Sequence, residues 1–337
     1  MLGMTITRRD ASTVITLEQA EFTTDMQKQI SGTLRELGRD PMTYGVVIKS
    51  AGPGAVANSH DHSGARRLSQ GSSAPSRAER GKIYDLCWQI ECFSKPIVSL
   101  LDGVISGTAA GLTLYGTHRV AGANYAFSAI GSAVDAVPDC GVLYALARMP
   151  PGIGLYLALT GRTIERDDAY ALGLVTHCIA AERFEEIEAL IAAAEPLDPV
   201  LDDRHEEPTP GWLMQNRERI ERFFAAGEGI EHIFDRLRGA GAQDTAWAEC
   251  VLADLAKRSL PAHTLTAEAL RRAGALDIDG VLEQDFRLAW HLTGLAQTPG
   301  GISLDSASIA GLFTSLGGDE LRLLPRIQMQ AGRGSAF

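Results

Sequence analysis

The feature that most constrains this chain is an alternation of short β-rich runs and amphipathic helical segments near its start. The runs STVITL at residues 12–17 and YGVVIKS at residues 44–50 carry the β-branched residues typical of strands. Between them, residues 23–40 have threonine caps, a glycine near the end and apolar residues at helical spacing, which are Met26, Ile30, Leu34 and Leu37. A strand, a helix and a second strand in this order predict a βαβ unit with parallel strands.

The same alternation continues to about residue 128. We expect a helix near residues 76–93, followed by a strand that opens at Lys95-Pro96 and a turn at Asp102-Gly103. A run of small residues from Ser106 then begins a tightly packed helix, and a further β-rich stretch follows it. The chain is therefore predicted to be an α/β protein built from stacked strand–helix units.

Changes in composition divide the rest of the chain. Residues 54–81 are rich in Ser, Gly, His and Arg and are expected to form a long loop, while helical patterns take over from residue 141. We predict a core at residues 1–195, a polar linker at 196–212, a helical C-terminal region at 213–293 and a tail without a clear pattern at 294–337.

The charge balance of the chain limits its partners. A formal net charge of −11 argues against nucleic acid as the main partner. The five cysteines are scattered without a CxxC pair, so we expect buried free thiols in a reducing compartment. The first residues lack the apolar core of a signal peptide, and no apolar run approaches the ~18 residues that a membrane helix needs. We expect a cytoplasmic protein that does not bind membranes.

Three segments together resemble the enoyl-CoA hydratase/isomerase superfamily, also called the crotonases. They are GVVIKSAGPGAVANSHD at 45–61, SKPIVSLLDGVISGTAAGLTLYGTHRVAGANYAFS at 94–128 and LALTGRTIERDDAYALGLVTHCI at 157–179. The resemblance implies an α/β fold, a crotonase-type spiral of ββα units, here with a helical C-terminal region. It also implies an acyl-CoA thioester as substrate, with coenzyme A arriving as part of that substrate and no separate cofactor. By the same resemblance we expect a homo-oligomer, either a trimer or a dimer of trimers.

Within the superfamily, the chain looks most like the 3-hydroxyisobutyryl-CoA hydrolases. The tripeptide GLT at 111–113, the turn VPDCG at 137–141 and the long helical segment at 256–292 carry this resemblance. It weakens after about residue 293, where the C-terminal signature of those hydrolases is not evident.

The resemblance implies an oxyanion hole made of two backbone N–H groups. By their positions in the family's motifs, Asn58 and Thr108 would supply these groups. Such donors stabilise the negative charge that develops on the thioester oxygen, and each contributes on the order of 3–4 kcal/mol. The family usually has Ala and Gly at these two positions. Because the donor is a backbone group, the different side chains do not remove it.

The acid–base groups that the resemblance implies are only partly present. Hydratases and 3-hydroxyisobutyryl-CoA hydrolases share a glutamate four residues after a phenylalanine, and counting from Phe127 places Gly131 there. A second glutamate of many hydratases is matched by Gly111, and the hydrolases lack it too. The aspartate of the hydrolases' Pro-Asp step is present as Asp139. Asp139 is therefore expected to act as a lone general base, or as a nucleophile like the aspartate of the related 4-chlorobenzoyl-CoA dehalogenases.

Other polar residues are candidates to assist Asp139. Asp135 precedes it by four residues and would form a carboxyl pair with it if the turn were helical; the alternative is a solvated turn aspartate. His60, beside the expected oxyanion loop, is either a general base or simply a loop residue. His60 and His62 have no third ligand at a typical spacing, so we expect no metal site there.

Basic residues of the long loop and the helix after it are the candidates for binding CoA phosphates. We select Arg66, Arg67 and Lys82, with Arg77 and Arg80 nearby. The basic residue that the family has before the oxyanion loop is replaced here by a Gly-Pro-Gly sequence, and the family's adenine-side motif is also changed. Binding of CoA is therefore expected to be altered or weakened.

Three functions are open on the sequence alone. The leading hypothesis is hydrolysis of a short (3-hydroxy)acyl-CoA thioester by Asp139 and the two oxyanion donors. The first alternative is a divergent enoyl-CoA hydratase, isomerase or dehalogenase-like enzyme that uses Asp139 with His60 or Asp135. The second alternative is an acyl-CoA-binding or scaffold protein that has lost catalysis, which Gly131 and the altered CoA motifs favour.

Overall fold

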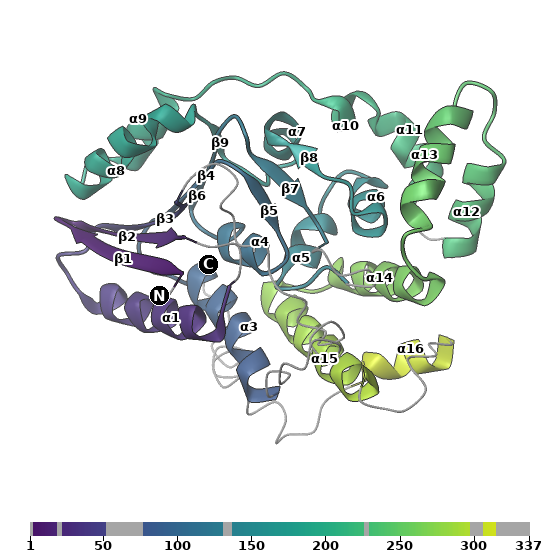
Figure 1. The fold of residues 1–337 in the computed structure, drawn as a ribbon, viewed down its shortest axis with the longest axis horizontal. Coiled ribbons are helices and arrows are strands. Elements are labelled where there is room, and N and C mark those ends of the chain that lie inside the picture. Colours follow the sequence, from purple (N-terminus) through teal and green to yellow (C-terminus); the bar gives the residue numbers. More distant parts are fainter. Residues whose placement is uncertain are drawn as a thin grey trace. The chain divides into compact units, whose positions relative to one another are not determined.

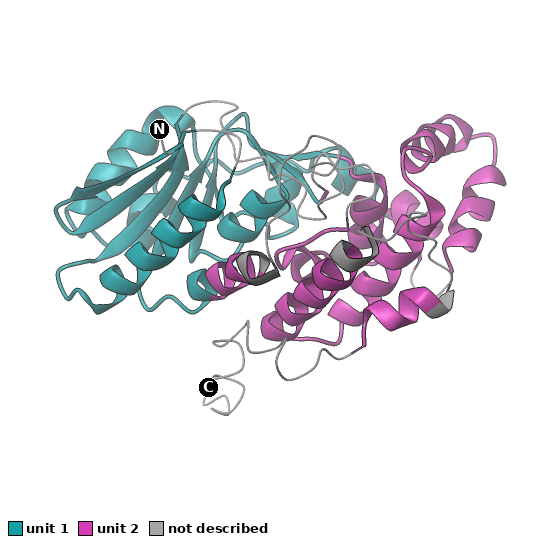
Figure 2. Ribbon diagram, turned by 60° about the horizontal axis from the view of Figure 1, so that its bottom comes forward, with its two compact units in different colours: residues 1–60, 89–129, 163–217 teal, residues 61–88, 130–162, 218–337 magenta. Residues whose placement is uncertain are grey.

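The chain is divided into two compact units in a computed structural model, which describes residues 3–18, 22–51, 77–130, 137–225, 229–296 and 306–314. Unit 1 comprises residues 1–60, 89–129 and 163–217, and unit 2 comprises residues 61–88, 130–162 and 218–337 (Figure 2). The linear boundaries that we drew after residues 195, 212 and 293 stay a prediction.

Unit 1 is built on a six-stranded sheet of order β1-β2-β3-β4-β6-β9 (Figure 1). Neighbouring strands are parallel throughout, except for the antiparallel pair of β1 and β2. A smaller sheet has the order β5-β7-β8. The strands are β1 (Met4–Arg9), β2 (Ser12–Leu17), β3 (Gly45–Ser50), β4 (Ile97–Leu101), β5 (Val104–Ser106), β6 (His118–Ala121), β7 (Ala126–Ser128), β8 (Ile164–Glu165) and β9 (His177–Cys178).

Among its described residues, unit 1 has six helices. They are α1 (Thr24–Arg39), α4 (Thr108–Thr113), α7 (Arg166–Ala171), α8 (Phe184–Ala192), α9 (Leu197–Asp202) and α10 (Trp212–Gln215), with a 3₁₀ turn at Ala181–Arg183. Two of these helices, α8 and α9, pack on the larger sheet. Side chains of α8 and α9, among them Ile187, Ile191 and Leu201, pack with Val47 and Val98 of the sheet in one buried cluster. Helix α1 lies on the other side of β1 and β2 (Figure 1). Because both faces of the larger sheet are buried, its central strands consist of nearly continuous apolar residues.

The predicted strand–helix alternation is confirmed in unit 1. The run at 12–17 is β2, and it pairs in parallel with β3, so that Val14 lies opposite Val47. The helix between them begins where expected, because the Thr23 hydroxyl accepts a hydrogen bond from the Met26 N–H at 3.3 Å. The helix ends at Arg39, one residue after Gly38, and Asp40 is its C-cap.

Unit 2 is helical. Its helices are α3 (Arg77–Glu91), α5 (Val142–Leu146), α6 (Ile153–Thr160), α11 (Arg217–Phe224), α12 (Ile230–Arg238), α13 (Thr245–Leu255), α14 (Leu260–Ala273), α15 (Ile278–Ala296) and α16 (Ser306–Leu312). Two of these helices cross a unit boundary. The last three residues of α3 belong to unit 1, and α11 starts at the last residue of unit 1. No helix in the described ranges has both the length and the apolar character that crossing a membrane requires.

None of the five cysteines forms a disulfide bond, as the sequence predicts, but only three of them are buried. Cys87, Cys140 and Cys178 have no exposed surface, whereas Cys92 and Cys250 are exposed. The expectation that all the thiols are buried was therefore wrong for two positions. Both exposed cysteines lie at or near the solvent-facing side of a helix, where a small thiol costs little to expose.

Gly154 provides a sharp test of the packing of unit 2. A Cβ atom at this position of α6 would lie 2.0 Å from the carbonyl oxygen of Leu146, a backbone atom that cannot rotate away. We expect Gly154→Ala to lower the free energy of unfolding by at least about 2–3 kcal/mol. Gly32→Ala in α1 is the matched control. A Cβ atom added there would meet nothing within 4 Å, so this substitution should stabilise the chain by about 0.5–1 kcal/mol. Urea unfolding measures the change in the free energy of unfolding for each variant. Equal changes in the two variants would contradict the close packing of Gly154 against Leu146.

Candidate active site

The turn into α4 is the part of unit 1 where the sequence places an oxyanion donor. Gly107 has φ +55°, a conformation that residues with a Cβ rarely adopt, and it sits immediately before the helix. Thr108 is the first helical residue and is 2% exposed. The N–H groups of a first helical turn have no acceptor within the helix, and the helix dipole favours negative charge there. This local geometry suits the Thr108 N–H as an oxyanion donor. That role stays a prediction.

In unit 2, Asp139 is held at both of its carboxylate oxygens. The phenol of Tyr84 on α3 donates to Oδ2 at 3.2 Å, and the N–H of Cys140 donates to Oδ1 at 2.7 Å. Cys140 and Gly141 both have positive φ, +57° and +83°, so the chain turns sharply just after the aspartate. Asp139 is half-buried. The turn therefore presents an oriented carboxylate that keeps contact with solvent.

A second carboxyl group reaches the same turn from α15. Asp285 is 2% exposed, and its Oδ2 accepts the N–H of Gly141 at 2.7 Å. The Tyr84 oxygen lies 3.5 Å from the backbone carbonyl oxygen of Asp285, and the Tyr84 ring packs edge-on against Phe286. Tyr84 thus joins the turn of Asp139 to the buried face of α15.

Burial and like charge determine the protonation of this cluster. Burial raises the pKa of Asp285 well above its ordinary value, the Asp139 charge raises it further, and the Gly141 N–H opposes both effects. Burial, followed by the Asp139 charge, also raises the pKa of Tyr84, so the phenol keeps the proton that it donates. A hydrogen bond with Cys87, followed by burial, raises the pKa of Cys140, so that this residue is a thiol and not a nucleophilic thiolate.

Most of the other residues predicted for the site lie outside the described residues. These are Asn58, His60, Arg66, Arg67 and Asp135, together with Gly131. The remaining candidate for the CoA phosphates, Lys82, is exposed on α3. Among the predicted residues, the described structure therefore provides Thr108 in unit 1 and Asp139 and Lys82 in unit 2.

Tyr84 and Asp285 are site residues that the sequence reasoning missed. The sequence assigned no site role to either residue, because their partners are far apart in the chain. Asp139 is 55 residues from Tyr84, and Gly141 is 144 residues from Asp285. A signal for Asp285 was present nonetheless. It occupies the buried stripe of α15 with Val281, Leu282 and Ala289, where an aspartate is expensive unless it has a partner.

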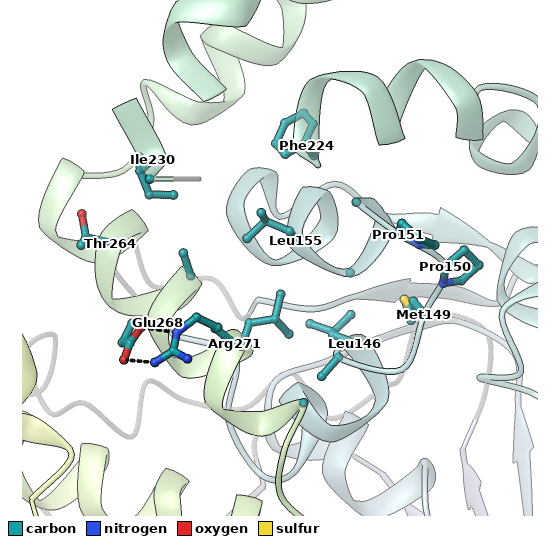
Figure 3. A pocket seen from close by; sticks show the side chains of 17 residues that line it. Leu146, Met149, Pro150, Pro151, Leu155, Phe224, Ile230, Thr264, Glu268 and Arg271 are labelled. Atoms are coloured by element: carbon teal, nitrogen blue, oxygen red, sulfur yellow. Dashed lines mark hydrogen bonds and ion pairs between the residues drawn. The ribbon is translucent and has the colours of Figure 1, made fainter. Parts of the chain in front are cut away.

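A cavity of about 520 Å³ lies elsewhere in unit 2. Leu146, Leu155, Phe224 and Ile230 give it apolar walls, and Glu268 and Arg271 stand at its side as an ion pair (Figure 3). Hydrogen bonds, first from Arg271, hold the pKa of Glu268 at about 2. None of the residues predicted for the site lines this cavity. Among the described residues that line it, the charged side chains are Glu268 and Arg271, and they pair with each other, so they are poorly suited to acid–base chemistry.

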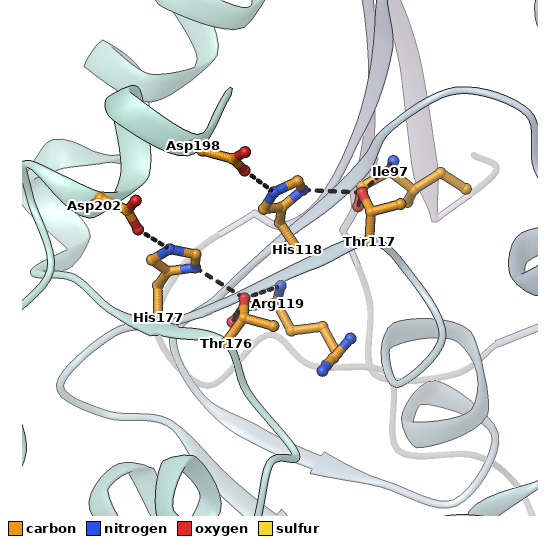
Figure 4. A network of polar contacts seen from close by, with 8 residues as sticks. All are labelled: Ile97, Thr117, His118, Arg119, Thr176, His177, Asp198 and Asp202. Atoms are coloured by element: carbon orange, nitrogen blue, oxygen red, sulfur yellow. Dashed lines mark hydrogen bonds and ion pairs between the residues drawn. The ribbon is translucent and has the colours of Figure 1, made fainter. Parts of the chain in front are cut away.

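Three histidines gather at one edge of the larger sheet in unit 1. His118 on β6 and His177 on β9 each face an aspartate of α9. The Nε2 atoms lie 3.2 Å from Asp198 Oδ1 and 3.1 Å from Asp202 Oδ1, respectively (Figure 4). The ring of His205 stands edge-on to that of His177. In the part of the chain that the structure describes, no group of three or more His, Cys, Asp or Glu side chains could hold a metal ion. These contacts attach α9 to the sheet.

The His177 contact predicts a pH dependence of stability. Burial lowers the pKa of His177, and Asp202 only partly opposes this effect, so the folded chain favours the neutral ring. The resulting stability is present above the ordinary histidine pKa of about 6.5 and is lost as the pH falls through the lower folded value. We expect His177→Gln to reduce the drop in the urea midpoint between about pH 7.5 and about pH 5.5. A drop of unchanged size in the variant would contradict this role.

Comparisons with known proteins agree on one family. Residues 15–303 match the family model described as enoyl-CoA hydratase/isomerase. A mitochondrial 3-hydroxyisobutyryl-CoA hydrolase from Xenopus tropicalis is 30% identical over 263 residues, which are 74% of this chain and 66% of that protein. The mitochondrial 3-hydroxyisobutyryl-CoA hydrolase from Homo sapiens is 27% identical over 84% of this chain and 76% of that protein.

Solved structures agree on the fold. An enoyl-CoA hydratase from Rhodobacter sphaeroides 2.4.1 matches with a TM-score of 0.81 at 25% identity, covering 94% of this chain and 98% of the other. A carnitinyl-CoA dehydratase from Mycobacterium thermoresistibile matches with a TM-score of 0.82 at 23% identity, and the match covers 94% of this chain and 97% of the other. The predicted crotonase-type α/β fold with C-terminal helices is therefore confirmed. The chain belongs to the enoyl-CoA hydratase/isomerase family and is an acyl-CoA-processing enzyme of the crotonase superfamily.

Proposed function

We propose that the protein hydrolyses the thioester of a short (3-hydroxy)acyl-CoA, with Asp139 as the residue that activates water. The observation that carries this proposal is the turn at Asp139, which holds both carboxylate oxygens by hydrogen bonds from Tyr84 and Cys140 and leaves the group half-buried. A general base must be fixed in direction and still reach water, and this carboxylate meets both requirements. The similarity to 3-hydroxyisobutyryl-CoA hydrolases over most of the chain supports the choice of reaction.

The proposed reaction has three parts. The thioester carbonyl accepts hydrogen bonds from the backbone N–H groups of Thr108 and Asn58, which stabilise the oxyanion by on the order of 3–4 kcal/mol each. A water molecule attacks the carbonyl carbon while Asp139 takes one of its protons. The tetrahedral intermediate then collapses, the carbon–sulfur bond breaks, and the CoA thiolate leaves and is protonated. The products are one carboxylic acid and one CoA thiol.

Coenzyme A enters this proposal as part of the substrate, and no separate cofactor is needed. Lys82, exposed on α3, and also Arg66 and Arg67 are proposed to bind its phosphates. A cytoplasmic location and assembly into a trimer or a dimer of trimers are also proposals, which depend on composition and on family resemblance. Size-exclusion chromatography with light scattering tests the assembly.

Hydration or isomerisation of an enoyl-CoA is the second candidate. The likeness to a solved enoyl-CoA hydratase, with a TM-score of 0.81, favours it. The two reactions differ in what they consume and release. A hydrolase frees the CoA thiol from a saturated substrate, whereas a hydratase changes the absorbance of the enoyl group and leaves the thioester intact.

The experiment is a panel of acyl-CoA substrates assayed for both signals. We expect thiol release to be fastest from 3-hydroxyisobutyryl-CoA or another short 3-hydroxyacyl-CoA, and we expect no loss of enoyl absorbance from crotonyl-CoA. Loss of enoyl absorbance without thiol release would replace hydrolysis by hydration. Neither signal, together with CoA binding by calorimetry, would support an acyl-CoA-binding protein that has lost catalysis.

A further inference from the structure

Asp285 is a buried acid, and no opposite charge among the described residues shifts its pKa. It lies on the inner side of α15 with 2% of its surface exposed, and Oδ2 accepts the Gly141 N–H at 2.7 Å. Its other oxygen, Oδ1, has no hydrogen-bond partner among the described residues. An ionised carboxylate in such a place is strongly disfavoured, so the group is expected to hold a proton.

The turn that Asp285 contacts is the one that orients Asp139. Cys140 and Gly141 follow each other with positive φ, and Cys140 carries a Cβ, so this conformation needs support from the surrounding structure. The two N–H groups of the turn are both accepted by carboxyl groups. The Cys140 N–H goes to Asp139 itself, and the Gly141 N–H goes to Asp285. The contact with Asp285 therefore supports the turn from α15, in addition to the hydrogen bond that Tyr84 donates to Asp139 from α3.

We propose that Asp285 is a positioning residue for Asp139. It fixes the Asp139–Gly141 turn by accepting the Gly141 N–H, and it stays protonated, so that Asp139 alone carries the negative charge of the pair. This proposal rests on the proposed function, in which Asp139 activates water. It also gives Asp139 a carboxyl neighbour, a part for which the sequence suggested Asp135.

The groups around Asp285 favour its neutral form. Asp139 and Cys140 face it from the turn, and Tyr84 faces it from α3, where Cys87 contacts Cys140. Tyr84 and Cys140 remain protonated for the reasons given above, and two carboxylates that share one site do not both ionise readily. A neutral carboxyl group keeps one oxygen as an acceptor. That oxygen is Oδ2, which contacts Gly141, so the proton belongs on Oδ1.

The test compares two substitutions at this position. Asp285→Asn keeps a neutral acceptor for the Gly141 N–H, so kcat for thiol release near pH 7 should stay within about threefold of wild type. Asp285→Ala removes the acceptor, and kcat should fall on the order of 30- to 100-fold with little change in KM, because the turn no longer fixes Asp139. If Asp285 ionises beside Asp139 as the pH rises, wild-type kcat should decline, and this decline should be absent in Asp285→Asn.

Asp168→Asn is the matched control. Asp168 is another buried aspartate, 4% exposed, which accepts the N–H groups of Leu213 and Met214 in unit 1. Its substitution should lower the unfolding midpoint without changing the pH profile of kcat. If Asp285→Asn is as inactive as Asp285→Ala, the protein needs a charged carboxylate there and the proposal is wrong. If neither variant changes kcat or its pH profile, Asp285 has only a packing role, which also overturns the proposal.

A second readout separates this proposal from the proposed function. In the protein labelled with ¹³C at aspartate carboxyls, one resonance should stay in the protonated form through neutral pH and should be missing in Asp285→Asn. This signal does not require an active enzyme. If the wild type releases no thiol from any acyl-CoA but the resonance is present, the proposed function fails while the protonated state of Asp285 stands. If Asp285 is ionised at neutral pH, the proposal fails regardless of activity.

Discussion

Substitution of Asp139 by asparagine is expected to reduce kcat for thiol release by on the order of 10²- to 10⁴-fold, because the base that activates water is lost. KM and the unfolding midpoint should change little. The amide has the same shape, and its oxygen can still accept the Cys140 N–H, which contacts Asp139 Oδ1 at 2.7 Å. The measurement is steady-state thiol release with saturating 3-hydroxyisobutyryl-CoA, together with thermal unfolding of both proteins.

Asp135→Asn is the control for the Asp139 variant, since it removes the other carboxylate of the same stretch of sequence. We expect this control to retain most of the wild-type rate. If Asp139→Asn kept more than a third of the wild-type kcat, or if Asp135→Asn lost as much activity as Asp139→Asn, Asp139 would not be the principal base.

The second large effect is expected at Gly107. Alanine at φ +55° is strained, and relief of that strain must turn the peptide that carries the Thr108 N–H. Displacing one oxyanion donor costs on the order of 10²- to 10³-fold in kcat, so Gly107→Ala should lose about that much. Kinetics under saturating substrate measure the loss, and circular dichroism checks that the variant is folded.

Thr108→Ala is the matched variant for this prediction. It removes the side chain but keeps the backbone N–H, so we expect kcat within about threefold of wild type. This pair separates a backbone donor from a hydroxyl donor. Strong loss of activity in Thr108→Ala, with a mild effect of Gly107→Ala, would assign the role to the threonine side chain instead.

The fold could be predicted from the sequence where periodicity is strong. β2, α1 and β3 were recognisable because their apolar residues face a buried sheet or a helix, and the resemblance to crotonases placed the turn before α4. β1 was missed for a physical reason. Of its six residues only Met4 is buried and the others are exposed, and the apolar residues Met4 and Ile6 alternate with threonine over only four positions, which is too short a pattern to mark a strand. It forms by antiparallel pairing with β2, in which Met4 lies opposite Leu17.

The site could be predicted only in part. Asp139 was found because a local motif marks it, whereas Asp285 and Tyr84 reach it through contacts between distant segments. Local patterns do not show such contacts. The helical pattern of α15 was recognised, but no role was assigned to its one buried aspartate. A buried acidic residue that has no oppositely charged residue near it in the sequence is a candidate functional residue once the structure is known.

Single-turnover hydrolysis in ¹⁸O-labelled water tests whether Asp139 directs water onto an acyl-CoA thioester. With enzyme in excess over 3-hydroxyisobutyryl-CoA, we expect equal amounts of CoA thiol and free acid. The acid should carry ¹⁸O from the first turnover, and peptides that contain Asp139 should stay unlabelled. An unlabelled acid with ¹⁸O in the Asp139 carboxylate would show that Asp139 attacks the carbonyl itself. Absence of both products would contradict hydrolysis altogether.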